Sequence, residues 1–440
     1  MAIVFVLIAL LVVAVLVTGN WYVWRRLFRD TTKGPGAVRR AGAAVIVGGW
    51  ALAVGALVAE RGGAPFRLQQ VLAWPGFLWL ALALYLLLAV LAGELVRPVL
   101  RRILERRAGA RGAAAPVPAR PEPIPAGQGA GNGPGGAAGG AADDGTPGDG
   151  PAAGSGASGP RETPAAPSRR LFVSRVVGGA AAAAAVGTVG YGTYGVLRGP
   201  RVKRVTVPLA KLPRAAHGYR IAVVSDIHLG PVLGRGFAQK VVDTINSTQP
   251  DLIAVVGDLV DGSVKDLGPA AAPLARLRAR HGSFFVTGNH EYFSGAEQWV
   301  EEVRRLGLNP LENARRELPH FDLAGVNDVA GEDEGQGPDY AKALGDRDRE
   351  RACVLLAHQP VQIHDAVDHG VDLQLSGHTH GGQLFPGNLV AGLANPTLAG
   401  LDRYGDTQLY VSRGAGAWGP PTRVGAPSDI TVIELASGHA

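Results

Sequence analysis

The sequence of 440 residues has only one cysteine, Cys353, and is short of charged side chains. A single cysteine excludes an intramolecular disulfide framework and any zinc or iron–sulfur site built from several cysteines. Asp, Glu, Lys and Arg make up 18% of the chain, against about 25% in a typical soluble domain. Hydrophobic residues make up 47%. The shortage of charge points to membrane segments, and the length allows about two or three domains.

The formal net charge of +6 is positive, but its placement matters more than its sum. Binding to nucleic acid requires a basic stripe on a folded face. Here the arginines cluster beside apolar segments instead. We therefore expect a membrane as the partner of the basic residues and no nucleic-acid partner.

Three apolar runs lie near the start of the chain, at Ile3–Val17, Ala41–Ala59 and Val71–Leu91. Each approaches the roughly 20 residues that a helix needs to cross a bilayer. The first run resembles a signal peptide in length but lacks a basic segment before it, which favours a retained span over a cleaved one. We expect residues 1–104 to form three transmembrane helices.

The arginines around these runs predict the topology. They are frequent in 25–40 and again in 97–107, whereas the loop between the second and third runs holds only Arg61 and Arg67. Basic loops stay on the cytoplasmic side. The N-terminus is therefore expected outside and the segment after the third span inside.

Residues 105–168 consist mainly of Gly, Ala and Pro and lack apolar periodicity. Such a composition cannot bury enough surface to offset chain entropy, so we expect a disordered linker without chemistry of its own.

Residues 169–199 begin with a pair of arginines and continue as a mildly apolar stretch. The run Ser168-Arg169-Arg170-Leu171-Phe172 resembles a twin-arginine export signal. An ordinary fourth transmembrane helix is the alternative. Both interpretations carry the following domain out of the cytoplasm, so we expect a multi-pass protein of the cell membrane with its C-terminal domain on the extracytoplasmic side.

Residues 200–440 have the sequence pattern of an α/β domain and are numerous enough to form a buried core. Short β-branched runs predict strands at 202–208, 219–224, 251–256, 283–287, 352–357, 372–375, 408–412 and 430–434. Helices are expected at 236–246, 269–280, 295–306 and 361–368. Strands that alternate with helices imply substantial parallel pairing.

Polar side chains follow several of the predicted strands directly. They are Asp226, His228, Asp258, Asn289, His290, His358, His378 and His380. Ligands of open α/β sheets gather at the carboxyl ends of the strands. Imidazole and carboxylate donors suit Mn, Fe, Zn, Ni or Co better than Ca or Cu(I). These donors are too many for one tetrahedral ion, but they suffice for two ions if one carboxylate bridges.

These residues stand in recognisable blocks: Asp226-Ile227-His228, Gly257-Asp258, Gly288-Asn289-His290-Glu291, His358 and Gly377-His378-Thr379-His380. In this order they resemble the motif blocks of the calcineurin-like metallophosphoesterase superfamily, over about residues 219–435. Leu311-Glu312-Asn313, 323–326 and Ser412-Arg413-Gly414 resemble its membrane-associated bacterial branch. The resemblance implies a two-sheet β-sandwich flanked by helices, C-terminal to an all-α membrane region.

The resemblance also implies a role for each matching residue and, as cofactors, two divalent metal ions such as Mn, Fe or Zn. Asp226, His228 and His380 would hold the first ion. Asn289, His358 and His378 would hold the second. Asp258 would bridge both. His290 has no implied metal and is the expected catalytic residue, placed to protonate the leaving oxygen or to stabilise phosphoryl charge.

Further residues near the motifs receive less specific interpretations. Asp261 is interpreted as a partner that orients a ligand, and Glu291 as structural. Arg413 either contacts a substrate phosphate or has a surface or packing role. Trp418 is expected in a packed corner, and Cys353 as an inert buried thiol.

The expected function is that of a membrane-anchored dinuclear phosphohydrolase acting through a metal-bound hydroxide. Its substrate is a phosphomonoester, phosphodiester or pyrophosphate; a lipid-linked one is favoured by the nearby span and by relatives that act on lipid-nucleotide diphosphates. One alternative is a non-catalytic metal- or phosphate-binding envelope module on the same fold. Another is a transporter or sensor, but the spans contain few polar residues, which favours simple anchoring.

Overall fold

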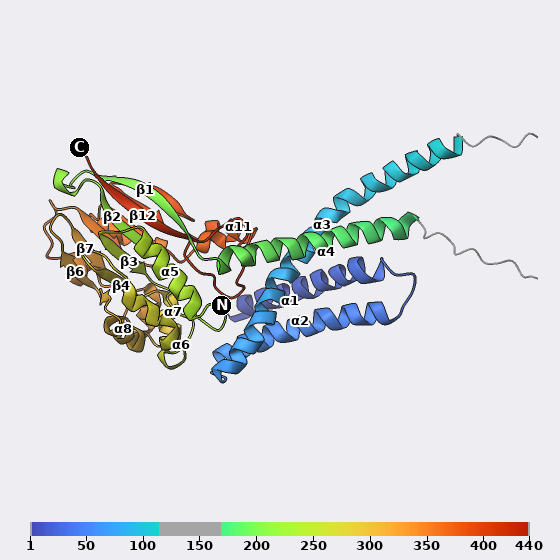
Figure 1. The fold of residues 1–440 in the computed structure, drawn as a ribbon, viewed down its shortest axis with the longest axis horizontal. Coiled ribbons are helices and arrows are strands. Elements are labelled where there is room, and N and C mark those ends of the chain that lie inside the picture. Colours follow the sequence, from blue (N-terminus) through green and yellow to red (C-terminus); the bar gives the residue numbers. More distant parts are fainter. Residues whose placement is uncertain (1, 114–168, 439–440) are drawn as a thin grey trace, which may run out of the picture.

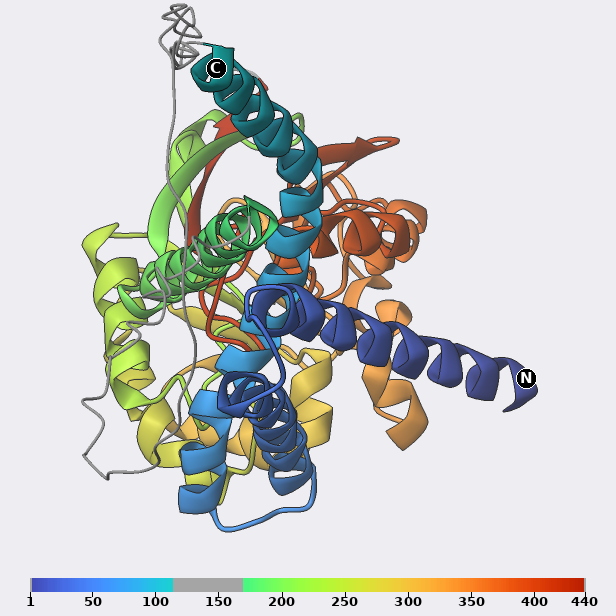
Figure 2. The same ribbon diagram turned by 90° about the vertical axis from the view of Figure 1, so that its right-hand side faces the viewer.

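The computed structural model describes residues 2–113 and 169–438. They form a bundle of long helices joined end-on to an α/β domain (Figures 1 and 2). The long helices are α1 (Ala2–Trp24), α2 (Ala37–Arg61), α3 (Phe66–Ala113) and α4 (Arg169–Leu197), and a π-helical turn at Arg25–Arg29 continues α1.

Three helices of the bundle are long and apolar enough to cross a membrane: Ala37–Arg61, Phe66–Arg107 and Arg169–Leu197. Their composition indicates membrane association. Helix α3 continues to Ala113, past residue 105, where we expected the linker to begin. The remainder of the expected linker, 114–168, lies outside the described residues.

The helices of the bundle pack through small residues, and polar contacts also join them, among them the hydrogen bond from Trp50 of α2 to Asn20 of α1. A side chain at Gly49 of α2 would collide with the ring of Trp79 on α3, so glycine permits the close approach of the two helices. Near the end remote from the α/β domain, Glu94 of α3 accepts a hydrogen bond of 2.7 Å from Arg26.

Two six-stranded mixed sheets form the core of the α/β domain. The first has the order β1 (Arg201–Leu209), β12 (Asp429–Ser437), β2 (Tyr219–Val224), β3 (Leu252–Val256), β4 (Ser283–Val286), β5 (Asn309–Pro310). The second has the order β10 (Gly400–Tyr404), β11 (Thr407–Val411), β9 (Leu373–Ser376), β8 (Cys353–Leu356), β7 (Asp322–Gly325), β6 (Ala314–Glu317). Strands β2 to β5 run parallel, as do β7, β8, β9 and β11.

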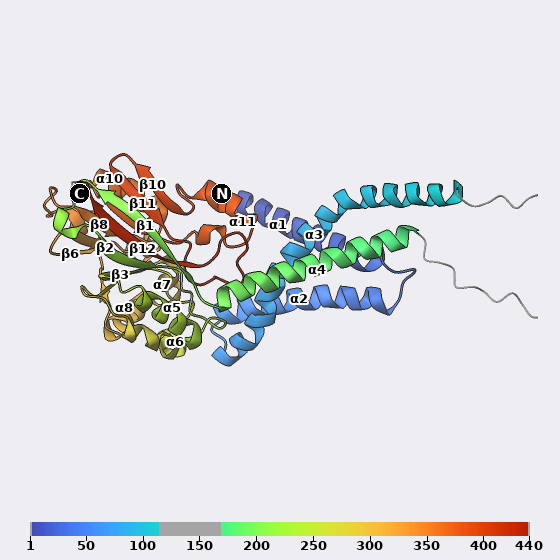
Figure 3. The same cartoon turned by 45° about the horizontal axis from the view of Figure 1, so that its top comes forward.

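The two sheets pack face to face, and helices cover their outer faces (Figure 3). Between the sheets lies an apolar core to which Val223 and Val256 contribute from one sheet and Leu356 and Leu375 from the other. The domain's helices are α5 (Arg235–Ser247), α6 (Val264–Ala271), α7 (Asn289–Ser294), α8 (Ala296–Arg305), α9 (Tyr340–Leu344), α10 (Ile363–Asp368) and α11 (Gly387–Ala394). The expected two-sheet α/β fold is confirmed.

The predicted strands agree with the structure to within a few residues, but one predicted helix is wrong. We expected a helix at 269–280, whereas α6 begins at Val264 and gives way to a 3₁₀ turn at Ala272. Ser263 caps α6 by accepting a hydrogen bond from the backbone N–H of Asp266. Pro269 lies within α6, and Pro273 has no backbone N–H to continue the α-helical pattern, which explains the early end of the α-helix.

Candidate metal centre

The predicted site residues follow β2, β3, β4, β8 and β9: most lie in loops, whereas Asn289 and His290 begin α7 and His380 begins a 3₁₀ turn. The carboxyl ends of these strands meet along one edge of the sandwich, which is where α/β sheets bind ligands. Several of these residues have backbone φ in the left-handed region: Asp226 (53°), His228 (48°), Asp258 (51°), His378 (71°) and His380 (51°). Such conformations are costly for residues other than glycine and gather at functional sites.

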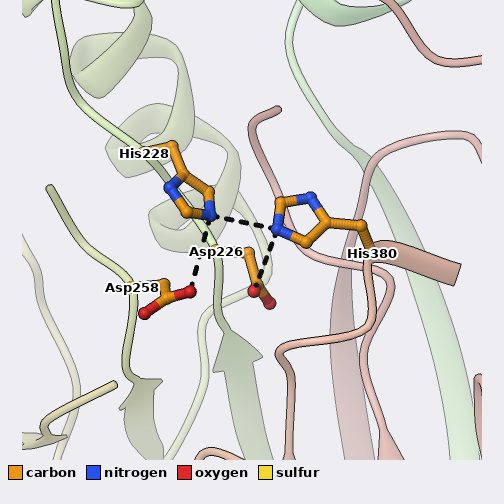
Figure 4. Close-up of side chains that lie close together, drawn as sticks. All are labelled: Asp226, His228, Asp258 and His380. Atoms are coloured by element: carbon orange, nitrogen blue, oxygen red, sulfur yellow. Dashed lines mark hydrogen bonds and ion pairs between the residues drawn. The ribbon is translucent and has the colours of Figure 1, made fainter. Parts of the chain in front are cut away.

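One group of donors comprises Asp226, His228, Asp258 and His380, whose ligand atoms lie within 4.8 Å of one another (Figure 4). Nε2 of His228 is 3.0 Å from Nε2 of His380 and 3.7 Å from Oδ2 of Asp258. Nε2 of His380 is 3.3 Å from Oδ1 of Asp226. All four residues are buried.

A second group comprises Asp258, His358 and His378. Nε2 of His358 lies 3.2 Å from Oδ2 of Asp258. Oδ1 of Asn289 lies 3.0 Å from Nδ1 of His378, which adds a neutral oxygen to this group. Asp258 therefore belongs to both groups, and the structure brings together every residue that we expected to hold metal.

The donor set fits divalent cations. Two imidazole Nε2 atoms face each other across 3.0 Å in the first group. In the second, the buried Nε2 of His358 faces Oδ2 of Asp258 at 3.2 Å. Imidazole nitrogens and carboxylate oxygens that converge in this way are a ligand set for a divalent cation. Donors from imidazole, carboxylate and amide, without thiolate, suit Mn, Fe or Zn.

Glu291 holds the loops after β3 and β4 in place, in agreement with the structural role expected for it. Its carboxylate accepts backbone hydrogen bonds from Asp258 (3.0 Å), Leu259 (2.7 Å) and Gly288 (2.6 Å). These bonds tie the loop after β3 to the loop after β4. They fix the backbone that carries Asp258 and Asn289.

Asp261 contacts two histidines of the site. Its Oδ1 lies 2.9 Å from Nδ1 of His228 and 2.7 Å from Nδ1 of His290. Burial opposes the charged form of Asp261, but the two imidazoles outweigh it and lower the pKa of this carboxyl to about 2. Burial likewise opposes protonation of His290, but the hydrogen bond to Asp261 dominates and raises its pKa to about 9.

The rim beside His290 is aromatic. The ring centroid of His290 lies 5.5 Å from that of Phe293 and 5.6 Å from that of Trp418. We expected Trp418 in a packed corner, which is wrong, since 51% of it is exposed. Trp418 therefore forms part of the exposed edge of the site, beside the His290 ring.

Arg423, which was not predicted from the sequence, contacts a predicted metal ligand. This buried guanidinium donates hydrogen bonds to the backbone oxygen (3.0 Å) and to Nδ1 (3.1 Å) of His380. Burial lowers the pKa of Arg423 to about 10. Arg413, which we considered for phosphate, instead lies 3.8 Å from Asp429. Arg423 lies 43 positions after His380 in the chain and belongs to no sequence motif, so no local pattern indicates this contact.

Comparison with known proteins identifies similar sequences. The family model for calcineurin-like phosphoesterases matches residues 219–382. A "Transmembrane protein with metallophosphoesterase domain" of Danio rerio is 39% identical over 259 residues, covering 56% of this chain and 59% of the relative. An "Uncharacterized metallophosphoesterase" of Helicobacter pylori is 39% identical over 247 residues, covering 56% and 66%. The chain thus spans less than two thirds of the length of these two relatives.

A shorter relative is matched over most of its length. An "Uncharacterized metallophosphoesterase" of Aquifex aeolicus is 35% identical over 240 residues. The match covers 53% of this chain and 91% of the relative.

Proposed function

Because the chain belongs to the calcineurin-like metallophosphoesterase family, we propose that it hydrolyses a phosphoester or pyrophosphate at a site for two divalent cations. The observation that carries the proposal is the position of Asp258, which belongs to both groups of donors. A carboxylate has two oxygens and can bridge two ions, whereas an imidazole cannot use one nitrogen for both.

The two groups assign a role to each donor. Asp226, His228 and His380 would hold one ion, and Asn289, His358 and His378 would hold the other. When bound, such a pair of ions activates a water molecule and neutralises charge on the phosphoryl group. The protein contributes the fixed positions of the donors, which the Glu291 and Arg423 hydrogen bonds support.

His290 is the proposed catalytic residue. Its Nδ1 is engaged by Asp261, which leaves Nε2 as the atom that can donate to the leaving oxygen. Its side chain is 15% exposed, whereas those of His228 and His358 are fully buried. His290 is therefore the histidine that a substrate can reach without displacing a metal ligand.

The apolar helices support anchoring in the membrane by several spans. The basic residues in 25–40 and 97–107 support a catalytic domain on the extracytoplasmic side. Helix α4 ends at Leu197, and β1 begins at Arg201, so little chain separates the membrane from the sandwich. Together with the apolar rim residues Phe293 and Trp418, this short connection supports a lipid-linked phosphoester as the substrate.

The test uses the full chain in lipid nanodiscs after removal of metal. Hydrolysis of an aryl phosphodiester and an aryl phosphomonoester is followed as Mn, Fe(II), Zn or Mg is added back, with Asp258→Asn as the control. Turnover that metal restores in the unmodified chain alone supports the proposal. The same two esters linked to lipid are tested as well. Metal binding without turnover on any of these substrates favours the non-catalytic metal- or phosphate-binding module.

The proposed export route has its own test. Arg169 and Arg170 begin α4, so the arginine pair of the resembling signal directly precedes the apolar stretch that would follow it across the membrane. Changing both to Lys should leave the α/β domain inside the cell, where an added protease cannot reach it in spheroplasts. Normal export of this variant would leave an ordinary fourth span as the explanation.

A further inference from the structure

One segment of the α/β domain is unusually apolar and exposed. Between His380 and Asp402 the sequence has no Asp, Glu, Lys or Arg. In this segment Phe385 is 51% exposed, Leu389 62%, Val390 71% and Leu393 89%. Helix α11, which carries the last three, has no buried residue among those described. Soluble domains rarely expose a continuous apolar patch of this kind unless something covers it.

The start of this segment lies against the long helices. Leu384 packs with Tyr85 of α3 and Val189 of α4 in one apolar cluster. The Tyr85 hydroxyl donates a hydrogen bond of 3.0 Å to the backbone oxygen of Phe385. Figures 1 and 3 show α11 at the end of the domain that faces the helices.

The contact with α4 indicates how deep the segment lies. Val189 precedes Leu197, the last residue of α4, by eight positions. At about 1.5 Å per residue, this places the contact about 12 Å inside the end of a candidate membrane span. A neighbouring loop contacts α4 closer to its end, since the hydroxyls of Thr193 and Thr422 lie 2.7 Å apart.

Exposed aromatic side chains mark the same part of α4. Tyr191 is 77% exposed and Tyr194 is 65% exposed. Tyrosines are enriched where transmembrane helices meet the boundary between lipid and water. The apolar segment therefore lies beside the part of α4 that passes through this boundary.

We propose that α11 and the preceding Phe385, together the α11 patch, insert into the bilayer leaflet on the side of the catalytic domain. Lipid is the occupant because the patch continues a contact with α3 and α4, both candidate membrane spans, and because it offers no charge to a protein partner. The proposal rests on the membrane anchoring proposed above. It adds that the catalytic domain itself enters the leaflet.

Insertion of the α11 patch would set the position of the metal site. Only residues 381–384 separate His380 from the patch. Gln383 connects this loop to the aromatic rim, because its side chain donates to the backbone oxygen of Trp418 (2.9 Å) and accepts from the Trp418 N–H (3.1 Å). The rim beside His290 would therefore face the lipid headgroups, and a phosphoester held in the leaflet would reach the site without leaving the membrane.

Site-directed spin labelling of the full chain tests this depth. Leu393→Cys, Val47→Cys and Val361→Cys are each labelled with a nitroxide in vesicles of phosphatidylcholine and phosphatidylglycerol. Val47 of α2 is 68% exposed and marks the hydrocarbon. Val361 is 45% exposed and precedes α10, which Figure 3 shows remote from the helices. Cys353 is buried and its pKa is raised to about 12, so it does not compete for the label.

Collisions with oxygen, which enters lipid, and with a water-soluble nickel complex give the result. We expect the label at 393 to match that at 47, with frequent oxygen and few nickel collisions, and the label at 361 to show the reverse. If 393 behaves like 361 while 47 remains in lipid, insertion of the α11 patch is overturned and the anchoring stands. If 47 is also open to nickel, the proposed anchoring fails, and this inference fails with it.

Discussion

Oδ1 of Asp261 lies 2.7 Å from Nδ1 of His290, the shortest of the contacts between a carboxylate and a histidine in the candidate site. The contact fixes which nitrogen of His290 remains available to a substrate. Asp261 also holds His228, so one carboxylate orients a proposed metal ligand and the proposed catalytic residue together. Such partners are a regular part of metal sites, because they set the orientation and tautomer of the rings.

Replacing His290 should separate catalysis from metal binding. His290→Gln removes the proposed proton donor but none of the proposed ligands, so kcat should fall by about 10²–10⁴-fold. Bound metal, measured by mass spectrometry of the purified protein, should not change. His364→Gln is the matched control, because His364 is exposed and outside the site. Loss of bound metal in His290→Gln would instead make His290 a ligand.

Arg423 should affect metal affinity through His380. Arg423→Met removes the hydrogen bonds that hold both the backbone and the ring of His380. Loss of a group that orients a ligand typically weakens metal binding by about 10–100-fold, which calorimetric titration of the metal-free chain would measure. Arg413→Met serves as the control and should bind metal as the unmodified chain does. Equal metal affinities in the two variants would show that Arg423 does not contribute to metal binding.

Gly377 should not accept a side chain. A Cβ at this position would collide with the Ser225 hydroxyl and the Asp226 carboxylate. Gly377→Ala should therefore displace Asp226, lower the metal content and cost about 1–3 kcal/mol of stability through overpacking. At Gly236, a Cβ would meet nothing within 4 Å among the described residues, so Gly236→Ala is the control. Thermal unfolding and metal content of both variants check the prediction.

Cys353 provides a prediction about pH. Burial raises its pKa to about 12, whereas an unfolded cysteine has a pKa near about 8.5. At a pH between these two pKa values, only the unfolded state loses the thiol proton. The contribution of Cys353 to stability should therefore decline as pH rises above about 8.5. At pH 8 the thiol should react with Ellman's reagent only after denaturant is added. Rapid reaction in the native chain would contradict its burial.

The strand-end motifs allowed the α/β fold and the set of site residues to be predicted from the sequence, because each motif follows a short apolar strand. Parallel strands carry the residues that follow them to one edge, so the proximity of Asp258 to His358 follows from local patterns. Helix boundaries were less predictable. The helix expected at 269–280 contains prolines whose effect on the last turns depends on the surrounding packing.

The contacts of Arg423 and of the α11 patch were not predictable in the same way. Arg423 belongs to no motif, and its contact with His380 depends on how a long loop returns to the site. The exposure of Leu393 depends on how α11 packs on the rest of the domain. The absence of charge from 381 to 401 was a visible signal, but sequence alone does not distinguish an exposed apolar helix from a buried one.

The most direct test of the central claim is a titration of the metal-free full chain with Mn²⁺. Bound ions and the hydrolysis of an aryl phosphodiester are measured in the same samples. We predict saturation at two ions per chain in the unmodified protein, with turnover that follows occupancy, and at most one ion with no turnover in Asp258→Asn. Saturation at a single ion, or turnover in the metal-free chain, would contradict a two-metal phosphoesterase built around Asp258.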